Sequence, residues 1–172
     1  MNLKIIKFLI IVILFIASCD ETSIDPKLEN NNVSSEFKSI SITYSSNNQT
    51  NQLKLNKQII SRYGNLYDLR LYFEDGSVCF IETKVEMDVN QTFLLTLNNS
   101  LGSLPNNYAR VEFYDRNNQR TYYSTFQNDG LSTNPDYYNN LYYILNLEDL
   151  RLGLFLSSDV VAKLNGKIAV LK

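Results

Sequence analysis

The stretch Ser39-Ile40-Ser41-Ile42-Thr43-Tyr44 (SISITY) decides the fold class, because small polar and apolar side chains alternate along it. A period of two residues is typical of a β-strand that buries one face. The same alternation recurs along much of the chain. Its apolar positions are Leu53, Leu55 and Ile59; Leu69, Leu71 and Phe73; Phe93, Leu95 and Leu97; Ala109, Val111 and Phe113; Leu141, Tyr143, Leu145 and Leu147; and Leu150, Leu152, Leu154 and Leu156.

Turn-forming residues separate these segments. They lie at Asp75-Gly76 and at residues 98–107, 115–119 and 128–136. Asn, Asp, Gly and Pro favour turns over strand interiors, and helical periodicity is nearly absent between them. The pattern therefore predicts an all-β domain, either a single antiparallel β-sandwich or a partly closed barrel.

The register of the Asp75-Gly76 hairpin stays open in the sequence. A two-residue loop would place Phe73 opposite Val78, whereas a three-residue loop would place it opposite Cys79. Both faces of the returning strand are apolar, which indicates a strand covered on both sides or a bulged turn.

Residues 158–166 also allow two structures. The run Ser157-Ser158-Asp159 can cap a short helix that ends at Asn165-Gly166. The same Asn-Gly pair can instead be the turn of a hairpin. In either case residues 167–172 are expected to form a strand that holds the carboxyl terminus.

The amino terminus has the organisation of an export signal. A short cationic stretch precedes ten uninterrupted apolar residues, 8–17, which are too few to span a bilayer. The end of this run and the two residues after it, Ile16-Ala17-Ser18-Cys19, resemble the lipobox of bacterial lipoprotein precursors. The resemblance implies that residues 1–18 are a signal peptide and that Cys19 carries a diacylglycerol as the first residue of the mature protein. Such acylation anchors a protein to a membrane that it does not cross.

The residues after Cys19 bear on location and on domain boundaries. Asp20 and Glu21 resemble the acidic sorting signals of Gram-negative lipoproteins, which cause inner-membrane retention in some lineages and surface display in others. We expect a cell-envelope lipoprotein, in the outer membrane, that faces the periplasm or the surface. Residues 19–36 are poor in apolar side chains and are expected to be a lipidated, disordered tether. The folded β-sandwich domain is placed at residues 37–172.

Composition excludes several kinds of function. The chain carries 16 Lys and Arg against 18 Asp and Glu, and the basic residues are scattered between acids, so a nucleic-acid partner is not expected. It contains no His, which excludes a Ser-His-Asp triad, a Cys-His dyad and histidine-bound zinc. With Cys19 lipidated, Cys79 has no intrachain partner and is expected to be a buried, inert thiol.

No cofactor or metal is expected either. Asp and Asn oxygens at residues 115–118 and 128–130 are the kind that calcium prefers, but their spacing matches no calcium loop, and turns need the same residues. Paired carboxylates remain as the chemistry of a glycoside hydrolase, the least favoured of three functions. No catalytic residues are proposed, and the protein is not expected to be an enzyme.

Tyrosine is the enriched residue type that indicates a function. The chain has 12 tyrosines, several of them in adjacent pairs. Neighbours on a strand face opposite sides, so one member of each pair is expected outside the core, where its ring suits protein or glycan partners. The candidate ligand-binding residues are Tyr122, Tyr123, Tyr137 and Tyr138. We expect the site at the place where the 128–140 loop meets these four residues. The resulting hypothesis is a lipid-anchored binding or accessory module; the alternative is a structural subunit of an envelope assembly.

Overall fold

The computed structural model describes residues 34–64, 66–87, 90–96, 106–137, 142–155 and 157–172, with the side chains of residues 136 and 137 excluded. These residues form one 3₁₀ turn, η1, and ten strands. Their bounds are η1 (Ser35–Phe37), β1 (Lys38–Tyr44), β2 (Thr50–Tyr63), β3 (Leu66–Phe73), β4 (Val78–Thr83), β5 (Gln91–Leu95), β6 (Tyr108–Asp115), β7 (Arg120–Ser124), β8 (Gln127–Tyr137), β9 (Tyr142–Gly153) and β10 (Ala162–Leu171).

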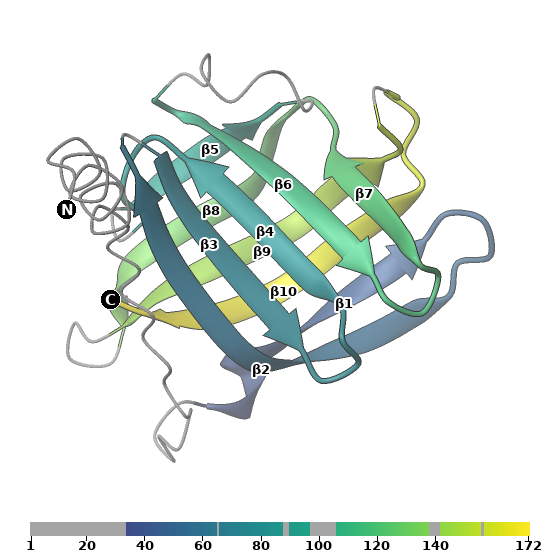
Figure 1. The fold of residues 1–172 in the computed structure, drawn as a ribbon, viewed down its shortest axis with the longest axis horizontal. Helices are drawn as coiled ribbons and strands as arrows, with labels where there is room; N and C mark the ends of the chain where they lie inside the picture. The colour runs from purple at the N-terminus through teal and green to yellow at the C-terminus, as the bar shows by residue number, and fades with distance from the viewer. Residues whose placement is uncertain (1–33, 65, 88–89, 97–105, 138–141, 156) are drawn as a thin grey trace, which may run out of the picture.

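The strands form a single sheet that closes on itself as a barrel (Figure 1). Neighbours follow the order β10, β1, β2, β3, β4, β6, β5, β8 and β9, and β9 pairs with β10 to complete the ring. β7 lies between β6 and β9 at one end of the barrel. The all-β prediction, with its partly closed barrel, is confirmed. One pair, β5 with β6, is parallel rather than antiparallel.

The interior is filled by the apolar side chains that occupy every second position of the strands. Ile40 and Ile42 of β1 are 1% and 0% exposed, and the predicted inward residues of β3, β5 and β6 within the described chain are equally buried. The largest fully buried side chains include Phe93 and Phe113. Full burial of each such side chain contributes about 1.5 to 3 kcal/mol, so the alternation observed in the sequence is the main source of stability.

Two bulges change which residues face inward, and the sequence did not reveal them. In β2 the register shifts between Leu55 and Lys57, so Gln58 is buried where the parity predicted Ile59. An extra residue in one strand reverses the inward and outward positions beyond it. Farther along, Leu154 lies beyond β9 and is exposed, contrary to prediction; Leu97, Leu141 and Leu156 lie outside the described residues.

The second bulge lies in residues 158–166, for which both predicted structures, the short helix and the hairpin, are wrong. Asn165-Gly166 is neither a helix end nor a hairpin turn but lies within β10, where the pairing with β9 shifts between Leu164 and Gly166. The Asn165 side chain accepts a hydrogen bond from the backbone N–H of Asp149 at 2.8 Å, which replaces a ladder bond at the irregularity. The predicted strand over residues 167–172 is confirmed, since β10 continues to Leu171.

The Asp75-Gly76 turn is confirmed, but its register matches neither alternative. Phe73 lies opposite Ser77, with its N–H donating to the Ser77 carbonyl at 2.9 Å, so the loop comprises residues 74–76. Gly76 adopts a φ of +86°, which suits the left-handed position of a three-residue hairpin. The turn over residues 115–119 is confirmed, whereas residues 128–136 belong to strand β8 and not to a loop.

Candidate functional site: a polar cavity at one end of the barrel

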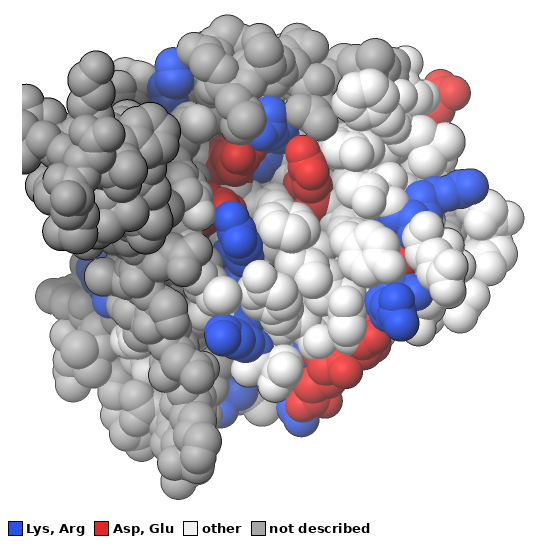
Figure 2. Space-filling model, viewed as in Figure 1, with Lys and Arg blue, Asp and Glu red and all other residues white. Residues whose placement is uncertain are grey.

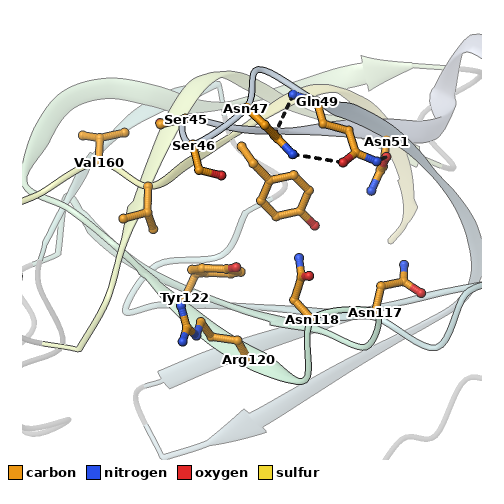
Figure 3. Close-up of a pocket in the computed structure, with 12 residues that line it drawn as sticks. Ser45, Ser46, Asn47, Gln49, Asn51, Asn117, Asn118, Arg120, Tyr122 and Val160 are labelled. Atoms are coloured by element: carbon orange, nitrogen blue, oxygen red, sulfur yellow. Dashed lines mark hydrogen bonds between the residues drawn. The ribbon is translucent and has the colours of Figure 1, made fainter.

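A cavity of about 870 Å³ opens at the end of the barrel where β1 ends and β2 begins. Figure 3 shows its two walls, the β1–β2 loop on one side and the β6–β7 hairpin on the other, with Val160 of the β9–β10 connection at one end. The lining residues are mostly amide and hydroxyl side chains. They are Tyr44, Ser45, Ser46, Asn47, Gln49, Asn51, Asn117, Asn118, Arg120, Tyr122, Val160 and Val161.

The β1–β2 wall is organised by its own side chains. Asn47 accepts the N–H of Gln49 at 2.9 Å, an Asx turn that lets the chain reverse between the strands. The amides then form a series along the rim: Asn47 Nδ2 donates to Gln49 Oε1 and Gln49 Nε2 donates to Asn51 Oδ1, each at 3.2 Å (Figure 3). These exposed amides retain spare donors and acceptors that face the cavity.

The β6–β7 wall is built on the carboxylate of Asp115, which is 1% exposed. Its Oδ1 accepts the backbone N–H groups of Asn117 and Asn118 at 2.9 and 3.2 Å, and its Oδ2 accepts Asn118 Nδ2 at 2.8 Å. Oδ2 also accepts a hydrogen bond from the hydroxyl of Tyr44 in the opposite wall. The acid therefore orders the turn and joins the two hairpins.

Two tyrosine rings form the deeper part of the lining. Tyr44 and Tyr122 are 8% and 5% exposed, and their ring centroids lie 6.4 Å apart at an interplanar angle of 55°. Burial, supported by the negative charge of Asp115, raises the pKa of both phenols above the ordinary value. Both hydroxyls consequently stay protonated across the physiological pH range and can act as donors.

The arrangement suits binding of a polar ligand. The volume is within the usual range of small-molecule sites, a few hundred to about a thousand cubic ångströms, but the lining is more polar than is usual for them, which favours a ligand rich in hydrogen-bonding groups. The described residues include no group of three or more Cys, Asp, Glu or His placed to hold a metal ion. Asp115 in particular already accepts hydrogen bonds with both oxygens, so its environment is that of a structural carboxylate.

The predicted tyrosine site is only partly assembled. Tyr122 lines the cavity, but its neighbour Tyr123 faces outward. The Tyr123 ring packs edge-on against the Phe155 ring, with 5.4 Å between the two ring centroids. Tyr123 pairs with Gly153 at one end of β9, whereas Tyr137 pairs with Tyr142 at the other end. At about 3.3 Å per residue, that separation is on the order of 30 Å. Tyr138 and Cys19 lie outside the described residues.

Sequence reasoning missed most of the cavity lining. The alternation places Tyr44 among the inward residues of a strand, residues 115–119 were assigned to a turn and weighed as calcium ligands, and residues 45–51 received no assignment. Two separated runs of Asn, Gln and Ser between strands were the available signal. What was lacking was the pairing that brings the two runs to the same end of the barrel.

Comparison of the chain with protein-family models, with characterised proteins and with solved structures found no match. In the part of the chain that is described, no helix has the length and hydropathy that a membrane crossing requires.

A second group of polar residues lies on the outer face of β3, β4 and β6, where Figure 2 shows acidic and basic side chains side by side. Arg70 pairs with Asp68 at 2.7 Å, and Arg110 pairs with Glu82 and lies 3.9 Å from Glu112. The pair Arg110–Glu82 joins β6 to β4, and the other two pairs lie within one strand each, so ion pairing on this face of the sheet explains the cluster.

Proposed function

We propose that this protein is a lipid-anchored binding module of the cell envelope that takes a glycan in the cavity at the end of its barrel. The observation that carries the proposal is the chemistry of the lining. Planar amides and hydroxyls that both donate and accept match the hydroxyl groups of a sugar, and the buried rings of Tyr44 and Tyr122 support the cavity from beneath. The volume of about 870 Å³ has room for more than one sugar unit.

The position of the cavity agrees with an anchor at the amino terminus. Ser34, the first described residue, leads through η1 into the beginning of β1, and the cavity lies beyond Tyr44 at the end of the same strand. The seven residues of β1 separate the two points by about 20 Å. A tether that begins at a lipidated Cys19 would hold the opposite end of the barrel toward the membrane and leave the cavity open to solvent.

Direct binding measurements test the proposal. The full-length chain, purified in detergent, is titrated with a panel of neutral and acidic oligosaccharides. The heat of binding and the rise in the midpoint of thermal unfolding are recorded. Gln49→Ala and Asn51→Ala should each weaken binding, because both amides lie on the rim. Gln52→Ala is the control, since Gln52 is an exposed amide next to Asn51 on β2 but does not line the cavity. Absence of binding across the panel would refute the glycan proposal.

The second function, a structural subunit of an envelope assembly, is favoured by a different observation. Phe126, Leu154 and Phe155 are 61%, 39% and 58% exposed, and they lie where β7 meets the end of β9. Clustered exposed apolar residues mark protein contact surfaces. The double variant Phe126→Ser, Phe155→Ser should disrupt such an assembly but leave glycan binding intact. After crosslinking of cell envelopes, the complex that contains the protein should then have a lower mass.

A further inference from the structure

The cavity contains one charged side chain among its described lining residues, Arg120 at the start of β7. The side chain of Arg120 is exposed at the mouth of the cavity. Within the described part of the chain its guanidinium forms neither an ion pair nor a hydrogen bond. The remaining lining side chains are neutral. This local charge is opposite in sign to that of the whole chain, which has a formal net charge of −2.

Among the described residues no ion pair joins Asp115 to Arg120, although the two are paired in the β6–β7 register and the charge of Asp115 acts on Tyr44 and Tyr122. The carboxylate of Asp115 is buried and is directed to the amides of its own turn and to Tyr44. Arg120 instead lies beside Tyr122 on the wall of the cavity, as Figure 3 shows. Since no described residue accepts a hydrogen bond from the guanidinium, which lies next to the cavity, its N–H donors are suited to an acceptor supplied by the ligand.

We infer that the bound glycan is acidic and that Arg120 recognises its carboxylate; this inference rests on the proposed glycan-binding function. The planar fork of arginine matches a carboxylate with two parallel hydrogen bonds, a geometry that a neutral hydroxymethyl group does not offer. The neutral amides of the rim then contact the sugar hydroxyls, while Arg120 selects sugars that carry the acid. The ligand class is therefore a uronic or sialic acid-containing oligosaccharide.

The experiment compares matched pairs of ligands. Oligosaccharides of galacturonic, glucuronic, mannuronic and guluronic acid, and a sialylated oligosaccharide, are each paired with the same compound after chemical reduction of its carboxylates to primary alcohols. Binding to the full-length chain is measured by calorimetry at two salt concentrations. The acidic member of the recognised pair should bind about tenfold to a hundredfold more tightly than its reduced form, and this preference should decrease as salt is raised.

Variants assign the preference to Arg120. Arg120→Gln should remove most of the preference for the acid but retain the weaker binding of the reduced form. Arg116→Gln changes the net charge equally, on an exposed residue of the same turn that does not line the cavity, and should preserve the preference.

The outcomes separate the inference from the function on which it rests. Equal binding of both members of every pair, or an equal loss of the preference in both variants, would overturn the role of Arg120 while glycan binding stands. If no member of any pair binds, the glycan-binding function itself fails.

Discussion

The hydroxyl of Tyr44, the last residue of β1, donates a hydrogen bond to the carboxylate of Asp115, the last residue of β6 and 71 positions later in the chain. Asp115 in turn accepts the N–H groups of the β6–β7 turn, so one buried acid holds both walls of the cavity. The shape of the cavity thus depends on a contact between residues that belong to different hairpins.

Tyr44→Phe should lower the free energy of unfolding by about 1 to 3 kcal/mol, because a buried carboxylate loses a donor. Chemical denaturation of the variant and the wild type measures the difference. Tyr63→Phe is the matched control, since that ring is 45% exposed and its hydroxyl is accessible to water; its effect should be within about 0.5 kcal/mol. Equal effects of both variants would show that the Tyr44 hydroxyl contributes nothing to stability.

Gly166→Ala should destabilise the barrel by about 2 to 4 kcal/mol. Gly166 has a φ of +139°, and an added Cβ would lie 2.8 Å from the Cα of Ile40 in the neighbouring strand β1. Gly64→Ala provides the comparison, because Gly64 also has a positive φ but no atom within 4 Å of the added carbon. Its cost should be about 1 kcal/mol. A smaller loss for Gly166 than for Gly64 in thermal unfolding would contradict the close strand approach.

Gln58→Leu should stabilise the protein by about 1 to 3 kcal/mol. The Gln58 side chain is turned into the core by the bulge in β2, is 3% exposed, and finds no hydrogen-bond partner for either amide atom among the described residues. Leucine of similar size removes that desolvation cost. A fall in the denaturation midpoint would mean that the amide is hydrogen-bonded in solution, with a buried water as the simplest partner.

Cys79 should be unreactive in the folded protein. Burial raises the pKa of its thiol from 9.0 to about 12, so at pH 8 about one molecule in ten thousand carries the reactive thiolate. Iodoacetamide should modify Cys79 only after denaturation, as shown by peptide mass spectrometry. Rapid modification of the native protein at pH 8 would refute the buried position.

The same pKa shift predicts an alkaline loss of stability. The folded state retains a proton that the unfolded state releases, so the free energy of unfolding should fall as pH rises from about 9 to about 12. Cys79→Ala lacks this titration. The stability advantage of the wild type over Cys79→Ala should therefore shrink across that window, and a constant difference would show that the thiol does not titrate as expected.

Cys19→Ala should release the protein from membranes or block its processing, because the lipobox resemblance makes this thiol the lipid attachment site. Cell fractionation and mass determination of the amino terminus provide the measurement. Cys79→Ala, which leaves the lipobox unchanged, should remain membrane-associated. An intact leader, or a mature protein that begins elsewhere than Cys19, would contradict the anchor.

Local alternation predicted the strands in which it is regular, but not β8, whose Asn, Asp and Gly residues had indicated a loop. Alternation such as that of Ile40, Ile42 and Tyr44 is a local property, because each strand must bury one face whatever its partners are. The missing histidine and the expectation of an inert Cys79 thiol were likewise readable from residue types alone. The lipobox expectation came from a resemblance in the same local sense, and it stays a prediction.

Only the tertiary structure decided how these strands meet. The bulges that bury Gln58 and place Asn165-Gly166 inside β10 arise because neighbouring strands must keep their hydrogen bonds while the sheet curves, and no local periodicity encodes that requirement. The cavity has the same origin. Asn, Gln and Ser satisfy a turn and line a binding site equally well, so their role at Asn47 and Asn118 became visible only when closure of the barrel brought the two turns face to face.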